Sequence, residues 1–193
     1  MKKDLRFIKT EESLYDTMLE LLKTNTIDKI TVTMICHEAK CSRNAFYLHY
    51  QTKEDLYNSI INDCIASIQK ACEPVVNKFK EIQERQNYLF MSHIINAVEN
   101  SKNTIYILIK SSHGVFSDML KEAIYQSFRK TSVELSKQAV TDAYCSYNMF
   151  LASGIVGFLE YWLTESHMSI DEAKNTLTKL TSGSTKEMIK DFS

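Results

Sequence analysis

Residues 31–53 constrain the fold of this chain most, because they read as two short helices joined by a tight turn. Thr33 is placed as the N-cap of the first helix, since its hydroxyl can accept a hydrogen bond from a free amide of the first turn. Ser42 is placed as the second N-cap, and the next helix is predicted over residues 43–47. Two helices in this arrangement are typical of a helix-turn-helix, whose second helix enters the DNA major groove with its N-terminal end.

The side chains at the start of the second helix suit contacts with DNA. Arg43 can fork onto guanine O6 and N7, and Asn44 can pair with adenine N6 and N7. Hydroxyl and ammonium groups nearby suit phosphate oxygens, and no acidic residue lies between positions 39 and 53. A solvated helix hairpin with a few surface charges is the alternative. The predicted DNA-binding residues are Thr33, Ser42, Arg43, Asn44, Tyr47, His49 and Lys53.

Residues 46–56, FYLHYQTKEDL, resemble the signature FYxHFxxKxxL of the TetR family of transcriptional regulators. Residues 30–35, ITVTMI, resemble the ITVxxI that opens the second helix of that family, and Ser42 begins the segment that matches its recognition helix. The chain departs from the family pattern at two positions: Lys40 replaces the glycine common in the turn, and Tyr50 replaces a phenylalanine. The resemblance covers roughly the first quarter to third of the chain.

The resemblance implies a homodimer with two domains. Residues 1–50 would form a DNA-binding helix-turn-helix domain, and residues 51–193 a helical domain for dimerisation and effector binding. Repression is the default activity of the family, while some relatives are activators or co-regulators. Regulators of this type often hold a small effector between helices of the second domain. The sequence identifies neither the effector nor the residues that would bind it.

An all-α fold also follows from the scarcity of residues that break helices, since the chain holds four Gly and one Pro. Thr10 is expected to cap the first helix, and Pro74 to end a helix that starts at Lys53. Ser169 and Glu172 form a capping box at the start of the final helix. Between these points helices are predicted over residues 75–85, 87–100, 103–111, 116–137 and 141–165, and the last over 170–191.

Residues 147–163 are too apolar for an ordinary surface helix, which indicates burial within the chain or against a partner. Glycine weakens a helix, so two glycines here suggest a close helix crossing. The segment also resembles a GxxGxxxxW helix of a TetR subgroup, in which the last two helices pair with those of a second subunit. The predicted dimer interface is Gly154, Gly157, Phe158, Tyr161 and Trp162; a core helix within one chain is the alternative.

Other classes of protein find less support in the sequence. The formal net charge is −1, so attraction to DNA would have to come from a local patch. Five Cys at irregular spacing suggest reduced thiols in a cytoplasmic protein, and no apolar run reaches membrane-spanning length. Cys36, His37 and Cys41 lack the second ligand pair of a zinc site, so we expect no metal and no cofactor. No catalytic His constellation or phosphate-binding glycine loop indicates an enzyme.

The sequence therefore predicts a ligand-responsive, homodimeric repressor that binds a palindromic operator. A helical ligand- or protein-binding module that no longer reads DNA is the second hypothesis. It is kept open by residues 1–60, in which nine basic residues balance nine acidic ones.

Overall fold

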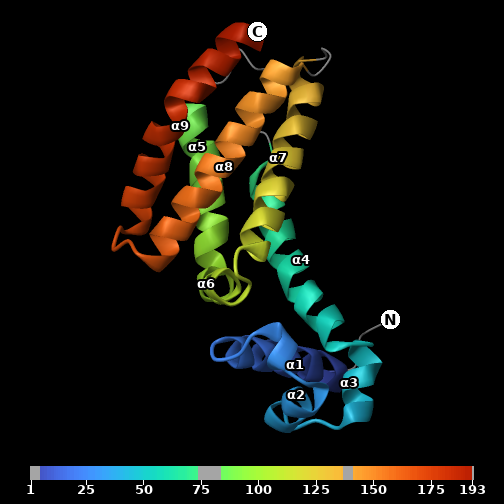
Figure 1. The fold of residues 1–193 in the computed structure, drawn as a ribbon. Coiled ribbons are helices and arrows are strands. Elements are labelled where there is room, and N and C mark those ends of the chain that lie inside the picture. The colour runs from blue at the N-terminus through green and yellow to red at the C-terminus, as the bar shows by residue number, and fades with distance from the viewer. Residues whose placement is uncertain (1–4, 74–83, 137–140, 193) are drawn as a thin grey trace. The chain divides into compact units, whose positions relative to one another are not determined.

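The computed structural model describes residues 5–73, 84–136 and 141–192, and these ranges hold helices and no strand. The all-α prediction is confirmed. The elements are α1 (Leu5–Leu22), the short 3-10 helix η1 (Ile27–Lys29), α2 (Val32–Glu38), α3 (Arg43–His49), α4 (Lys53–Ala71), α5 (Glu84–Asn100), α6 (Lys102–Ser111), α7 (Val115–Ser136), α8 (Asp142–Thr164) and α9 (Ile170–Phe192) (Figure 1). Pro74 and nearly all of the helix predicted over 75–85 lie outside the described residues.

Helix ends follow local hydrogen bonding, and two of the four predicted caps are wrong. Ser42 caps α3 as predicted, with its Oγ accepting from the amide of Ala45 at 3.1 Å. Thr31, not Thr33, caps α2, because the helix begins at Val32, the residue directly after Thr31. Thr10 lies inside α1, which has already begun at Leu5, and its hydroxyl donates to the carbonyl of Arg6.

The capping box at the start of α9 is confirmed. The amide of Ser169 donates to Glu172 Oε2 at 2.8 Å, and the amide of Glu172 donates to Ser169 Oγ at 3.3 Å. Ser169 Oγ also donates to Glu172 Oε2 at 2.8 Å, and the bonds from the Ser169 amide and hydroxyl to the carboxylate favour its charged form and lower the pKa of Glu172.

The turn between α2 and α3 places Lys40 in the left-handed region, with φ of 52°. The amide of Cys41 donates to the carbonyl of Cys36 at 3.0 Å, and that of Lys40 donates to the carbonyl of His37 at 3.2 Å. This pair of bonds is a Schellman motif, in which glycine is the usual left-handed residue. Lys40 therefore keeps the turn geometry that glycine gives other helix-turn-helix proteins, at a cost in backbone strain.

The chain divides into two compact units, residues 1–64 with 103–116 and residues 65–102 with 117–193. The first half of α4 and most of α6 belong to the first unit, and the predicted domain boundary at residue 50 stays a prediction. Leu56 and Ile60 of α4 are fully buried. Tyr15, on α1, lies beside Cys64 of α4 and Thr104 of α6. The assignment of separate functions to the two parts of the chain stays a prediction.

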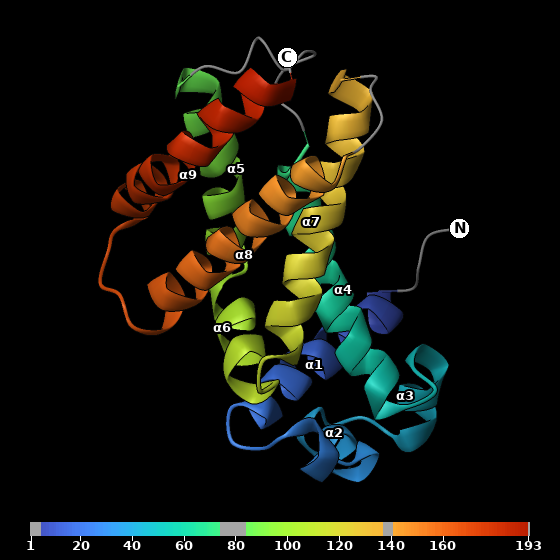
Figure 2. The same cartoon turned by 45° about the horizontal axis from the view of Figure 1, so that its top comes forward.

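Each unit has its own apolar core. The core of the first unit is formed by side chains of α1 to α4 and by the residue after η1. It includes Leu14, Met18, Ile30, Ile35, Phe46 and Ile60. In the second unit α9 packs against α5 and α8, and the three helices stay together in both views (Figure 1 and Figure 2). Its core includes Ile94, Ile95, Ile155, Leu159, Ala173 and Leu177. None of the described helices has the length and hydropathy that a membrane span requires.

We expect Lys40→Gly to raise the free energy of unfolding by about 1 kcal/mol, because glycine adopts a left-handed φ without the steric cost that a Cβ imposes. Urea denaturation followed by far-UV circular dichroism measures the change. Lys40→Ala is the control, since it removes the same charge and keeps the Cβ. If Lys40→Gly and Lys40→Ala raised the free energy of unfolding equally, the effect would come from removing the charge, and backbone strain at Lys40 would be contradicted.

Candidate nucleic-acid interface

The recognition helix α3 separates its residues into a buried and an exposed face. Phe46 is completely buried and anchors the helix in the core of the first unit. Arg43 and Asn44 are exposed at the N-terminal end, and Tyr47 is exposed one turn later. This distribution matches the predicted faces and leaves these three side chains accessible to a groove.

Arg43 and Thr33, both in the predicted DNA-binding set, contact each other. Nη2 of Arg43 donates to Oγ1 of Thr33 at 2.5 Å, which ties the first residue of α3 to α2. A guanidinium carries five N–H groups, so this bond leaves donors for a guanine edge. The contact restricts the rotamers of a long side chain in the free protein, which would reduce the entropy lost if Arg43 bound a partner.

Leu48 is a candidate contact that the sequence reasoning missed. Its side chain is 75% exposed, unusual for leucine on a helix that also anchors a core. It lies four residues after Asn44 and therefore on the same side of α3. An apolar side chain in the major groove can contact the methyl group of thymine. The spacing of four residues between Asn44 and Leu48 was the sequence feature that could have identified Leu48 as a candidate contact.

His49 packs within the first unit. Its ring lies over Phe7 of α1, with ring centroids 3.8 Å apart, and the residue is half-buried. This contact places His49 between α3 and α1.

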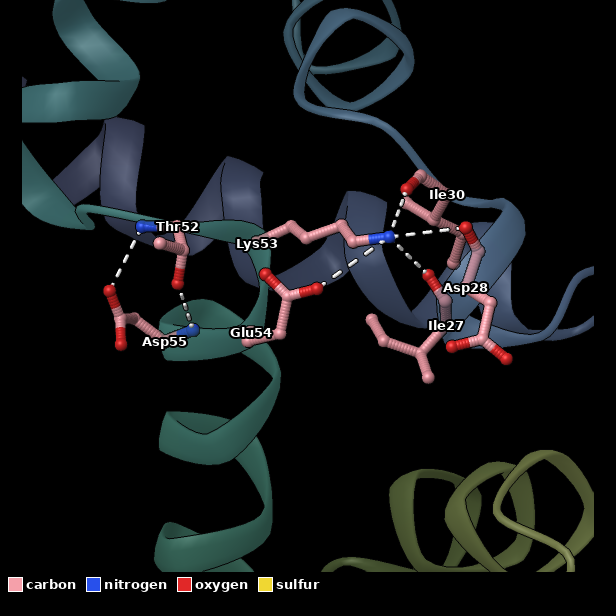
Figure 3. Close-up of polar contacts among 7 residues, drawn as sticks. All are labelled: Ile27, Asp28, Ile30, Thr52, Lys53, Glu54 and Asp55. Carbon is pink, nitrogen blue, oxygen red and sulfur yellow. Dashed lines mark hydrogen bonds and ion pairs between the residues drawn. The ribbon is translucent and has the colours of Figure 1, made fainter.

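Lys53 is the most extensively bonded residue of the predicted set (Figure 3). Its Nζ donates to the carbonyls of Ile30 at 2.7 Å, Ile27 at 2.8 Å and Asp28 at 3.2 Å. Glu54 Oε1 lies 3.7 Å away, and the Lys53 side chain is 18% exposed. The ammonium thus binds the last carbonyls of η1, where cations are favoured, and ties this segment to the start of α4.

The start of α4 is fixed a second time by a reciprocal cap (Figure 3). The amide of Thr52 donates to Asp55 Oδ2 at 2.9 Å, and the amide of Asp55 donates to Thr52 Oγ1 at 3.1 Å. This is a capping box with aspartate in the place of the usual glutamate. Because α3 ends at His49, the cap and the Lys53 bonds hold the chain just after the recognition helix.

The predicted dimer residues fall on opposite faces of α8. Phe158 is 9% exposed and Trp162 3%, and Trp162 Nε1 donates to the carbonyl of Met168 at 3.0 Å. These two belong to the core of the chain itself, because α8 packs this face against α9. Gly154, Gly157 and Tyr161 are exposed on the other face.

The cysteines in the helix-turn-helix are poor candidates for metal ligands. Burial, and then the neighbouring Cys36, raise the pKa of Cys41 to about 11, so its thiol keeps its proton at neutral pH. His37 is exposed, with Nδ1 3.0 Å from Glu38 Oε1. Over the described residues, no three His, Cys, Asp or Glu side chains are arranged to hold a metal ion.

Comparisons with known proteins agree on the fold. No protein-family model matches the chain. An uncharacterised HTH-type transcriptional regulator, YxbF of Bacillus subtilis strain 168, is 22% identical over 84% of this chain, which spans 42% of that protein. A TetR transcriptional regulator from Streptococcus agalactiae 2603V has 21% identity and a TM-score of 0.64, over 91% of this chain and 95% of that one. NalD, the secondary repressor of the MexAB-OprM multidrug efflux pump of Pseudomonas aeruginosa, has 18% identity and a TM-score of 0.61, over 91% and 96%. The chain has the TetR-type regulator fold.

We expect Lys53→Met to lower the free energy of unfolding by about 1.5–3 kcal/mol, because it removes charged hydrogen bonds to three carbonyls and keeps an apolar stem. Urea denaturation measures the loss. Lys23→Met is the control, since Lys23 makes an exposed ion pair with Glu20 that should contribute less than about 1 kcal/mol. Equal losses in the two variants would show that the carbonyl contacts do not stabilise the unit.

Proposed function

We propose that the chain is a DNA-binding transcriptional regulator, a ligand-responsive homodimer that represses transcription from a palindromic operator. This proposal rests on the exposed face of α3. Arg43, Asn44, Tyr47 and Leu48 are exposed on a short helix that Ser42 caps and Phe46 anchors. The TetR-type fold supports the same use of this face.

The residues of this face take different parts in the proposed complex. Arg43 and Asn44 read base edges, and Leu48 contacts a thymine methyl group. Ser42 and Tyr47 donate hydroxyl hydrogens to phosphates, since the Ser42 oxygen that accepts in the cap can still donate. Thr33 orients Arg43. His49 and Lys53 act by holding the domain together, because their polar or aromatic groups already contact the chain itself.

The dimer is supported by an apolar face of α8 that nothing in the described chain covers. Met149, Phe150 and Tyr161 are 37%, 65% and 52% exposed. A Cβ added at Gly154 or Gly157 would meet no atom within 4 Å, so packing inside the chain does not require glycine there. Small residues between larger apolar ones let a second helix approach closely. A two-fold dimer would present α3 to two half-sites about 34–36 Å apart.

Ligand response is supported by polar groups inside the second unit. Asn148 is 2% exposed and Ser92 7%, and within the described chain neither Asn148 Nδ2 nor Ser92 Oγ has a hydrogen-bond partner. Buried polar groups without partners cost stability, which suggests retention for another purpose. An effector that binds one arrangement of the dimer better than another would shift its affinity for the operator. The proposed effect of the protein, in the cytoplasm, is to repress transcription. Activation of transcription is the alternative.

The charge balance of the N-terminal region keeps a second candidate open, a helical binding module that does not read DNA. A selection from random duplexes separates the two candidates, because only a DNA reader enriches a sequence.

For the wild-type protein we expect that selection to enrich a near-palindrome. Arg43→Ala should lose about 1–3 kcal/mol of discrimination per half-site and relax the preference at one base pair. Tyr47→Phe should weaken binding to every duplex alike, since it removes a phosphate contact. Arg129→Ala is the control, because it removes the same charge from an exposed position on α7. No enrichment by the wild type, or identical profiles for Arg43→Ala and Arg129→Ala, would favour the non-DNA module.

We expect Gly157→Leu to shift the protein from dimer to monomer, through an overpacking cost of about 1–3 kcal/mol at the proposed interface. The chain itself has room for the new side chain, so folding should persist. Sedimentation equilibrium and circular dichroism together measure mass and folding. Asn96→Leu adds the same side chain to an exposed site on α5 and should leave the mass unchanged. A fully dimeric Gly157→Leu protein would exclude this face as the interface.

A further inference from the structure

A pocket of about 420 Å³ lies in the first unit, between the segment that follows α1 and the end of α6. One wall is formed by residues 22–26 with Lys29, and the other by Tyr106, Ile107, Lys110, Ser111 and His113. Both walls belong to the same compact unit. The pocket is separate from the exposed face of α3 and from the polar groups inside the second unit.

The lining of this pocket includes basic side chains and no acidic ones. Lys23, Lys29 and Lys110 border it, and no carboxylate is among the residues that line it. Lys23 is paired with Glu20 at 2.5 Å. Over the described residues no carboxylate lies within ion-pair distance of Lys29 or Lys110, and the Lys110 ammonium lies 6.0 Å from the centre of the Tyr106 ring. Two cations without carboxylate partners therefore border one concave site.

The end of α6 combines an unpartnered polar atom with an unusual backbone. Ser111 lines the pocket, and its Oγ, which is covered from solvent, has no hydrogen-bond partner in the described structure. Beside it His113 holds a left-handed backbone, with φ of 50°, next to Gly114 with φ of 92°. A strained residue that is not glycine is kept only where its surroundings determine its conformation, and such residues gather at functional sites.

From this geometry we propose that the pocket binds a small molecule that carries an oxyanion, a carboxylate or a phosphate, on an apolar body. Lys29 and Lys110 would bind the oxyanion. Leu22 and Ile107 form the apolar floor, since they line the pocket and are 4% and 3% exposed. A ligand site of this kind combines apolar lining with a few convergent polar groups.

The position of the pocket gives a bound anion a route to the helix-turn-helix. Lys29 belongs to η1, and the carbonyls of Ile27, Asp28 and Ile30 bind the Lys53 ammonium at the start of α4. A ligand that moves Lys29 would change the segment that Lys53 holds. This regulatory consequence rests on the proposed DNA-binding function, while binding of the anion does not.

Binding is tested on the full chain by heteronuclear NMR, with phenyl phosphate and benzoate as probes and benzyl alcohol as the neutral control. We expect either anion to shift the amide signals of residues 24–29 and 110–113, and the alcohol to leave them in place. Lys29→Gln/Lys110→Gln should raise the Kd at least tenfold. Lys70→Gln/Lys179→Gln removes the same charge from exposed positions outside the pocket and should not raise it. Equal weakening in both variants, shifts located elsewhere, or shifts with the alcohol would overturn the site.

The regulatory consequence is tested by measuring the Kd for the selected duplex with and without phenyl phosphate at constant ionic strength. We expect a severalfold change for the wild type and none for Lys29→Gln/Lys110→Gln. An unchanged duplex Kd beside anion binding by NMR would overturn the coupling alone. A wild-type chain that binds no duplex would overturn the proposed function and leave the NMR result as the test of the site.

Discussion

The arrangement of the first unit depends on one half-buried ammonium group, that of Lys53. Lys53 binds three carbonyls that lie 23–26 residues earlier in the chain, at distances of 2.7 to 3.2 Å. A lysine bonded in this way satisfies carbonyl groups in and just after the short η1 helix, including that of Ile27, which also accepts from the amide of Ile30. The same residue opens α4, and α3 ends four residues before it, at His49. A contact between distant parts of the chain thus fixes the geometry of the helix that is proposed to read DNA, as a rigid binding site requires.

The apolar segment of α8 has one buried and one exposed face. Trp162, Phe158 and Leu159 are buried in the core of the chain. Phe150, Gly157 and Tyr161 lie on the exposed face, where the glycine leaves open space. A helix that were apolar only for internal packing would carry polar residues on the exposed face. The uniform hydropathy of the segment therefore follows from adding a core stripe to a second apolar stripe, and hydropathy alone could not separate them.

Features governed by local rules could be predicted from the sequence. Ser42 and the Ser169–Glu172 capping box form bonds within three residues, so their residue types and spacing suffice. Thr31 and Thr33 both satisfy the same local rule, and in the structure Thr31 is the cap, since its Oγ1 accepts from the amide of Met34. The carbonyl contacts of Lys53 could not be predicted for a related reason, because its partners belong to a segment that only the folded unit brings near. The phosphate contact that its position at the start of a helix suggests stays a prediction.

The neutrality of residues 1–60 conceals a separation of charge, which bears on the hypothesis that this unit does not read DNA. Glu12, Asp16 and Glu20 are spaced four residues apart on one face of α1, and Glu38 of α2 borders the same hollow. Between positions 39 and 53 the chain has no acidic residue. Potentials at a surface are set by nearby charges, because salt screens distant ones within about 10 Å at 0.1 M ionic strength. An acidic α1 face and a basic α3 end would therefore orient the unit toward a phosphate backbone rather than cancel its attraction, so zero net charge does not argue against a DNA-reading face at α3.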